Sequence, residues 1–239
     1  MGRKISMAAL REIQEEHYRW VSTGGSEGRC ANLSGVKLSG IKLYNVNLNH
    51  ADLSGADLSS ANLSEVKLRG ANLSGADLRS VYLWNGADLR DADLSEADLT
   101  KANLFNSNLT GARLSGANPR GVKQKGANLS EANLFNANLT GARLSNANLR
   151  GIKQKGANLS EADLTKANLT RARLSGANLR GANLTDTVLS STDLRGAQGL
   201  TIEQLSEAKT FYKSRLDSDL MKQLKEEYPG LLEKPKPEE

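Results

Sequence analysis

The side chains with the most reactive chemistry are few, and their spacing decides whether they can act together. Asp88, Asp93 and Asp98 supply three carboxylates at intervals of five residues, and carboxylates are the ligands that Ca²⁺ and Mg²⁺ prefer. His17 and His50 are the only two histidines, whereas a zinc site needs several clustered His or Cys ligands. Whether the three aspartates form a metal cage therefore depends on the backbone that carries them.

Covalent catalysis has equally little support. Serine is abundant, but no histidine accompanies it in a pattern that indicates an activating base. Cys30 is the only cysteine, so it can form no internal disulfide, and it is expected to fill a small buried space rather than act as a nucleophile. The sequence predicts a protein that is not an enzyme and that has no metal or cofactor.

A repeat of five residues dominates the chain and is its main structural signal. Leucine recurs every fifth residue from Leu33 to Leu83, and the series resumes at Leu89 after one inserted residue, Gly86, and continues to Leu194. Of these 33 units, 30 have leucine at the centre. Alanine stands two residues before the centre in 23 units, and Asn or Asp stands just before it in 23. The three exceptional centres are Pro119, Gln124 and Gln154.

A period of five fits neither a helix nor a flat strand. Five residues advance about 500° around a helix, and an odd spacing alternates between the two faces of a strand. All leucines can point one way only if the chain turns a corner in every unit. The sequence therefore predicts a solenoid with Leu and Ala inside, and with Asn/Asp, Ser/Thr and Gly outside or in the turns. Asp88, Asp93 and Asp98 then occupy successive faces instead of one metal cage.

The motif A-(N/D)-L-x-x resembles the pentapeptide-repeat family over residues 31–197. This resemblance implies an all-β solenoid, a right-handed quadrilateral β-helix with four pentapeptides per coil. Periodicity alone leaves three or four sides open. With four sides and a coil spacing of about 4.8 Å, 33 units make about eight coils and a rod of about 40 Å.

The ends of the chain are expected to cap this rod with short helices, because a solenoid end exposes core and unpaired backbone. Residues 1–30 are predicted to be a helical cap and linker, with a helix over about 7–21 after Ser6. Residues 31–199 are the β-helix. Residues 200–239 form a second cap, in which Thr201 and Gln204 have capping-box spacing and another helix begins near Asp217, followed by a disordered tail. These ends resemble those of bacterial, especially cyanobacterial, members, and two capped ends predict a monomer.

Charge and aromatic residues provide the functional leads. Residues 112–180 contain 12 Lys or Arg but only three acids. In a four-sided coil, the near-identical stretches 111–130 and 141–160 lie half a turn apart, on opposite faces. The predicted interaction surface comprises Trp84, Phe105, Arg113, Lys123, Lys125, Phe135, Arg143, Lys153, Lys155 and Arg173.

Two classes of function remain. The favoured one is a non-catalytic, rigid scaffold for another protein. The alternative is weak, salt-dependent binding of nucleic acid or an anionic surface through residues 112–180. Some members of the family protect DNA gyrase by mimicking DNA, but the net charge of +5 is opposite to that of DNA and disfavours this role. The chain has no apolar run long enough to span a membrane and no signal peptide, so a cytoplasmic location is expected.

Overall fold

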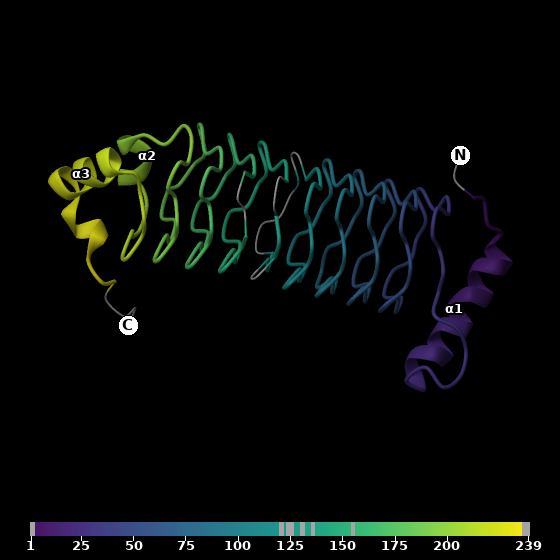
Figure 1. Ribbon diagram of the computed structural model, residues 1–239. Helices are drawn as coiled ribbons and strands as arrows, with labels where there is room; N and C mark the ends of the chain where they lie inside the picture. The colour runs from purple at the N-terminus through teal and green to yellow at the C-terminus, as the bar shows by residue number, and fades with distance from the viewer. Residues whose placement is uncertain are drawn as a thin grey trace.

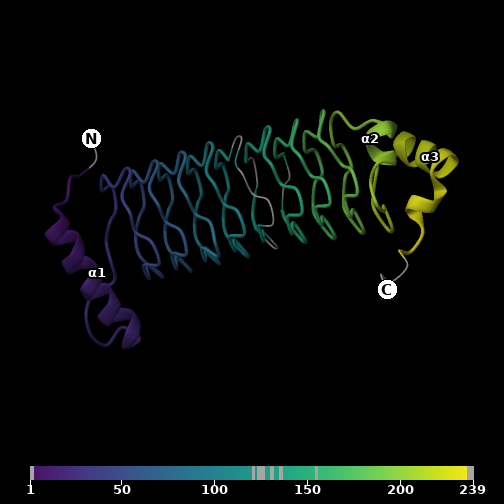
Figure 2. The ribbon, with the colours of Figure 1, turned by 180° about the vertical axis from the view of Figure 1, so that it is seen from behind.

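The chain forms a rod of stacked coils with helices at its two ends (Figures 1 and 2). The computed structural model describes residues 3–119, 122, 127–129, 132–134, 137–153 and 156–235. Helix α1 (Met7–Ser22) lies at the N-terminal end. Helices α2 (Ile202–Ser206) and α3 (Ser218–Glu227) and the 3₁₀ helix η1 (Pro229–Leu232) lie at the other end.

Backbone pairing shows that each coil of the rod contains 20 residues. Asn32 pairs in parallel with Asp52, and Asp52 pairs with Asn72, so each bridge joins residues that are 20 apart. The Leu33 N–H donates to the Asp52 carbonyl at 2.7 Å, and the Asp52 N–H donates to the Ala31 carbonyl at 2.9 Å. Twenty residues are four pentapeptides, so the coil has four sides.

Only one residue per pentapeptide forms a β-bridge, because the remainder of each unit makes a turn. The Leu33 carbonyl accepts from the Val36 N–H at 3.1 Å, which closes a four-residue turn. The third residue of this turn, Gly35, has φ +62°, the left-handed conformation that a type II turn requires. The β-helix is therefore a ladder of single bridges, and its described residues include no longer strand.

The interior is a narrow column of leucine and alanine side chains, and all the leucine centres among the described residues are at most 3% exposed. The inner positions that carry a hydroxyl satisfy it on the backbone. Ser107 donates to the Leu104 carbonyl at 2.7 Å, and Thr192 donates to the Leu169 carbonyl at 2.8 Å. This bonding removes most of the cost of burying a polar group. Gln124 and Gln154 lie outside the described residues.

The frequent Asn or Asp before each leucine has a structural role in the turn. The Asn72 side-chain oxygen, for example, accepts from the Ser74 N–H at 3.1 Å and from the Ser74 hydroxyl at 2.7 Å. A side-chain oxygen accepts from the backbone N–H two residues later at many other units along the rod, for example at Asp52, Asp163 and Asn178. Short carboxylate and amide side chains favour this local contact. The turn geometry thus accounts for the frequent Asn and Asp in the repeat.

The inserted residue Gly86 lies in a corner and leaves the ladder in register. Across it the spacing of paired residues becomes 21, as in Lys67 with Asp88 and Tyr82 with Asn103. Asn85 and Gly86 have φ +54° and +83°. Glycine tolerates such angles without steric cost, so the corner absorbs the extra residue.

Four ladders of bridges define four faces, which we call faces I to IV in chain order. Face I contains Asn32, Asp52, Asn72, Asp93, Arg113, Asn133, Lys153, Arg173, Asp193 and Arg215. Face II begins with Lys37, Asp57 and Asp77, and face IV begins with Asn47, Lys67 and Asp88. Face III contains Lys42, Asn62, Tyr82 and Asn103, followed beyond position 123 by Arg143, Asp163 and Asn183. Because the coil has four sides, faces I and III are opposite.

At the N-terminal end, α1 and the residues before it cover the first coil. Arg3 pairs with the open edge of the coil: its N–H donates to the Gly35 carbonyl, and its carbonyl accepts from the Lys37 N–H, both at 2.8 Å. Ser6 accepts from the Ala9 N–H at 3.1 Å and begins α1. Leu10 is 2% exposed against the core. The exposed edge is thereby paired and the apolar end is covered.

His17 of α1 is fully buried against the first coil. Its Nδ1 accepts from the Ala31 N–H at 3.0 Å, and its ring stacks on Trp20 at a centroid distance of 5.8 Å. The His17 Nε2 atom has no hydrogen-bond partner among the described residues. Burial, and to a smaller extent the neighbouring His50, lower the pKa of His17.

We expect the rod to lose stability as the pH falls below about 6.5, the ordinary pKa of histidine. The folded pKa of His17 is lowered, so below that value the unfolded chain binds more protons than the native one, and acid favours unfolding. The melting temperature should decrease as the pH is lowered from 7.5 to 5.5. The lower limit of this window is about one unit above the usual pKa values of carboxylates, so aspartates and glutamates contribute little to the change.

The His17→Asn variant keeps an acceptor for the Ala31 N–H and removes the titration, so its melting temperature should change less over this window. His50→Gln is the matched control, because it removes the other of the two histidines. An equal pH dependence in His17→Asn and the wild type would contradict the assignment.

The ladder continues beyond the last pentapeptide at the C-terminal end. After α2, Thr210 pairs with Val188 and Arg215 pairs with Asp193, at a spacing of 22. Phe211 occupies the inward position of leucine and is fully buried. The five-residue period predicts a β-helix that ends at residue 199, because α2 interrupts the period there, but the bridges of Thr210 and Arg215 extend the ladder beyond it.

Helix α2 also satisfies backbone groups at the open end. Thr201 accepts from the Gln204 N–H, and the Gln204 side-chain oxygen accepts from the Thr201 N–H, a reciprocal capping box. The Gln204 side-chain nitrogen donates to the carbonyls of Leu179 and Ala182 at 3.3 and 2.9 Å. One glutamine thus caps the helix and two edge carbonyls of the coil.

Candidate functional site

The carboxylates that could have formed a metal cage lie on different faces. Asp88 is on face IV, Asp93 on face I and Asp98 on face II. Asp88 pairs with Arg90, which donates at 2.8 and 2.6 Å and holds the pKa of Asp88 below its ordinary value. Among the described residues, no three His, Cys, Asp or Glu side chains are grouped closely enough to hold a metal ion.

Four exposed aromatic side chains gather on face III. They are Tyr44 (56% exposed), Tyr82 (48%), Trp84 (40%) and Phe105 (37%). Tyr82 and Trp84 flank the buried Leu83 and therefore point outward together. Phe105 follows one coil later, because Tyr82 pairs with Asn103. In the described part of the β-helix before residue 200, every large exposed hydrophobic side chain belongs to this group, which we call the aromatic stripe.

Local bonds hold parts of the stripe in place. The Tyr44 hydroxyl donates to a Glu65 carboxylate oxygen at 3.1 Å across one coil, and this bond raises the pKa of Tyr44. The Trp84 carbonyl accepts from the Glu65 N–H at 3.1 Å, next to the Gly86 corner. The Phe105 N–H donates to the Asn103 side chain at 3.2 Å. The backbone under the stripe is therefore fixed by the ladder and by turn contacts.

The basic candidates divide between opposite faces. Arg113, Lys153 and Arg173 lie on face I, where Lys153 and Arg173 pair directly. Arg143 lies on face III, and all four side chains are exposed. Arg113 approaches the Asp93 carboxylate at 3.8 Å. The structure thus separates Arg113, Lys153 and Arg173 from the aromatic stripe. The remaining candidates, Lys123, Lys125, Phe135 and Lys155, lie outside the described residues.

The structure also brings together residues that the five-residue period alone does not connect. Tyr44 and Tyr82 join Trp84 and Phe105, although Tyr44 and Phe105 are 61 positions apart. Arg215 follows α2 and extends face I beyond the predicted repeat, and Lys213 lies in the adjoining corner. A coil length of 20 residues already places Trp84 and Phe105 on one face, and the same spacing applied to Tyr44 and Tyr82 is the signal that would have added them.

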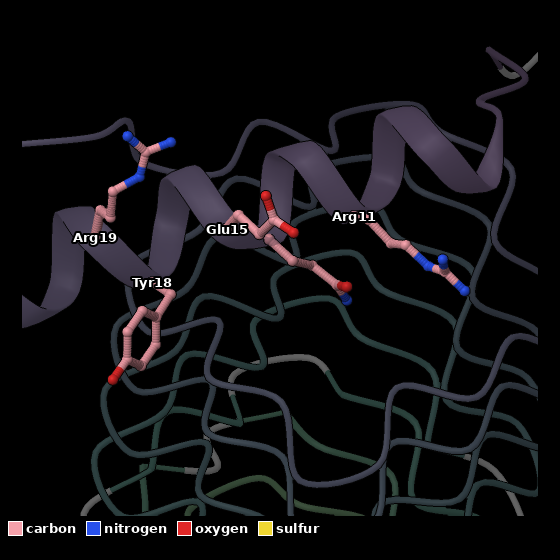
Figure 3. A pocket seen from close by; sticks show the side chains of 5 residues that line it. Arg11, Glu15, Tyr18 and Arg19 are labelled. Carbon is pink, nitrogen blue, oxygen red and sulfur yellow. The ribbon is translucent and has the colours of Figure 1, made fainter.

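A surface depression on α1 has only one wall. Arg11, Gln14, Glu15, Tyr18 and Arg19 line it, and all five belong to the helix. Figure 3 shows their side chains spreading along the side of α1 that faces away from the coils. With no second element opposite them, these side chains enclose no ligand.

Within the described residues, no helix combines the length and the apolar character needed to cross a membrane. A search of curated proteins found no match. Among solved structures, the chain is similar to HetL, a pentapeptide repeat protein involved in heterocyst differentiation regulation from the cyanobacterium Nostoc, with 32% identity over 83% of this chain and 92% of HetL and a TM-score of 0.46.

Two other solved structures are similar at lower identity. Rfr23, from the cyanobacterium Cyanothece, is 29% identical over 63% of this chain and 95% of its own, with a TM-score of 0.25. QnrB1, a plasmid-mediated fluoroquinolone resistance protein, is 22% identical over 79% of this chain and 90% of its own, with a TM-score of 0.34.

The family description "Pentapeptide repeats" matches residues 31–70, 47–85, 85–118, 120–151 and 157–196. These segments cover more than half of the chain and coincide with the ladder of 20-residue coils. Proteins of this family are structural repeat proteins that form right-handed quadrilateral β-helices. The chain belongs to the pentapeptide-repeat family.

Proposed function

We propose that this protein is a non-catalytic, rigid scaffold whose aromatic stripe on face III binds another protein. The observation that carries the proposal is the gathering of Tyr44, Tyr82, Trp84 and Phe105 on one face, whereas the described residues of the other three faces before residue 200 include no exposed large hydrophobic side chain. Tyr and Trp are enriched in the centres of protein interfaces, where they supply most of the binding energy. Contiguous exposed apolar surface on a soluble protein is typical of such a site.

The charge around the stripe favours a protein partner over nucleic acid. Between residues 41 and 106, face III carries one cation, Lys42, and one acid, Glu65, which is bonded to Tyr44. Single-stranded nucleic acid is bound by aromatic residues interleaved with several cations that follow the phosphates. Depletion of charge with a polar rim, here made by Asn45, Asn62 and Asn106 among others, is typical of a protein interface.

The rigidity of the rod adds to the argument. Each coil hydrogen-bonds to the coils before and after it, so the aromatic residues are presented on a preformed surface. Tyr44 and Phe105 are three coils apart, which corresponds to about 15 Å along the rod. A rigid surface loses little conformational freedom on binding, which favours affinity. Because helices cover both ends, end-to-end stacking is blocked, and we propose that the scaffold is a monomer.

The alternative function is weak binding of nucleic acid or an anionic surface through residues 112–180. The pairing of Lys153 with Arg173 on face I supports it. Arg143, however, lies on the opposite face, so these cations do not form one surface. Binding through this segment would weaken steeply with salt, because it releases counterions. Binding through the aromatic stripe would not.

Photocrosslinking tests the proposed face. A benzoylphenylalanine placed at Trp84 or Phe105 should form adducts with a discrete protein when the rod is mixed with a lysate of its source cells. The same group at Ser115 is the matched control, because Ser115 follows its leucine in the same way but on face I. The Trp84→Ser/Phe105→Ser variant should bind that protein about 30-fold or more weakly, as for aromatic hot spots.

The melting temperature of Trp84→Ser/Phe105→Ser shows whether a loss of binding comes from the surface or from unfolding. Trp84 and Phe105 are more than one third exposed, so their replacement should change the melting temperature little. Equal adducts from positions 84, 105 and 115 would exclude face III as the specific surface. Binding that disappears in 0.5 M salt but survives Trp84→Ser/Phe105→Ser would favour the basic alternative.

A further inference from the structure

A notch lined by four cations lies on face I near the C-terminal end. The coils that carry it precede and follow α2, which Figure 1 shows at that end of the rod. Its volume is about 380 Å³, and its lining consists of Arg171, Ala172, Arg173, Ser175, Ser191, Asp193, Lys213 and Arg215. The notch is on the face opposite to the aromatic stripe, and it joins residues on both sides of α2.

The notch forms because the short side chains of Ser191 and Asp193 lie in one coil, and the coils on either side have long side chains at the corresponding positions. Asp193 pairs with Arg173 on one side and with Arg215 on the other. In the adjoining corner, the Arg171 N–H donates to the Ser190 carbonyl at 2.9 Å, and the Ser191 N–H donates to the Tyr212 carbonyl at 2.7 Å. Arg171 and Lys213 therefore stand on either side of Ser191, as Arg173 and Arg215 stand on either side of Asp193.

The four cations are left without ion-pair partners of their own. None of Arg171, Arg173, Lys213 and Arg215 has a carboxylate oxygen within 4.0 Å among the described residues. The one acid in the notch is Asp193, and Arg195 donates to both of its carboxylate oxygens at 2.8 and 2.7 Å. This pairing lowers the pKa of Asp193. The notch therefore carries an excess of positive charge.

The dimensions match a compact anion. The two flanking coils are two coil spacings apart, or about 10 Å between backbones, so long side chains from both sides can reach one group between them. Guanidinium groups bind phosphoryl oxygens through paired N–H donors, and this match is the reason for the prevalence of arginine in phosphate sites. Ser175 and Ser191 also line the notch, and their hydroxyls can add neutral donors.

We propose that this notch binds the phosphoryl groups of a small phosphorylated molecule. Four cations around one acid suit a ligand with more than one negative charge, such as a diphosphate. The site is independent of the scaffold function proposed for face III, because it lies on the opposite face and uses different residues. Lys153, the next cation along face I toward the N-terminus, pairs with Arg173 and can extend the site for a larger ligand.

Calorimetry with inorganic pyrophosphate tests the proposal on the full chain. Wild-type protein should bind pyrophosphate with 1:1 stoichiometry. Arg173→Gln and Arg215→Gln should each weaken binding about tenfold or more, because each removes charged donors to the anion. Arg180→Gln is the matched control, since Arg180 is an exposed arginine of the same region on face II. It should leave the affinity unchanged.

A gain of affinity provides the sharper test. Asp193→Asn removes the one negative charge of the notch but keeps an oxygen that can accept the turn bond from the Arg195 N–H, as Asn178 does for the Arg180 N–H. It should bind pyrophosphate severalfold more tightly while its melting temperature stays close to that of the wild type. A non-specific cationic surface would respond equally to Arg173→Gln and Arg180→Gln.

Three results of these pyrophosphate titrations would overturn the proposal. These are non-saturable pyrophosphate binding, equal losses in Arg173→Gln and Arg180→Gln, and an Asp193→Asn affinity at or below that of the wild type. Binding of a 20-base-pair DNA duplex without binding of pyrophosphate would also overturn it, and would assign face I to nucleic acid instead. Failure of this site leaves the face III crosslinking experiment unaffected, because neither Trp84 nor Phe105 is changed.

Discussion

We expect Leu139→Asp to unfold the β-helix. Leu139 is fully buried in the leucine column, and its N–H donates to the Asn158 carbonyl at 2.7 Å in the next coil. Truncating such a leucine to alanine costs about 2–5 kcal/mol, and a buried, unpaired carboxylate adds several more. A loss of this size approaches the whole stability of an ordinary domain, about 5–15 kcal/mol. The circular dichroism melt should therefore show no native transition at room temperature.

Asn138→Ala and Leu139→Met are the matched controls for this experiment. Asn138 is only partly buried, and its side-chain oxygen accepts from the Thr140 N–H and hydroxyl at 3.3 and 2.7 Å, so its replacement should cost about 1 kcal/mol. Leu139→Met keeps the volume and should cost less than about 1.5 kcal/mol. Similar melting temperatures for Leu139→Asp and Asn138→Ala would contradict the inward direction of the leucines.

The second large effect is expected from Phe211→Ala at the C-terminal end. Phe211 is fully buried, and its N–H donates to the Leu231 carbonyl at 2.6 Å. The buried Leu205 of α2 and Leu224 of α3 pack in the same hydrophobic core. Removing a buried phenylalanine costs about 3–5 kcal/mol through lost contacts and the remaining cavity. The cap should therefore separate from the last coil at a lower temperature than the rod unfolds.

Hydrogen exchange can locate this loss along the rod. Each coil contacts only its neighbours, so opening begins at the destabilised end and extends inward. Amides of α2, α3 and the coils around Leu179 and Leu194 should lose protection first in Phe211→Ala, while those of residues 31–110 keep it. Tyr228→Ala is the control, because Tyr228 is 37% exposed and follows α3. Uniform loss of protection along the chain would show that Phe211 is not an end cap.

Much of the architecture follows from the sequence because the repeat is a local rule. A leucine at every fifth residue can face inward only if each unit contains a turn, and both the turn and the alternation of side chains are decided within about five residues. The helix starts at Ser6 and Thr201 are equally local, since each depends on one side chain and an N–H three residues later. Such features need no knowledge of distant contacts.

The surfaces depend instead on how the chain stacks. A period of five is compatible with three or four sides, and only the pairing of residues 20 apart places Tyr44 and Phe105 on one face. The single insertion at Gly86 changes that spacing to 21, and the coil after α2 changes it to 22. Lys213 and Arg215 reach the notch only through this last, irregular return of the chain.

The sequence by itself therefore determined the inward column of leucines, the turns and the family, because each of these depends on residues within single pentapeptides. The tertiary structure decided which side chains share a face, where Phe211 closes the core and which cations surround Asp193. The physical reason is that coil closure is a long-range property. One extra residue is absorbed at the Gly86 corner and two across α2, and the hydrogen bonds between coils then decide on which face every later residue lies.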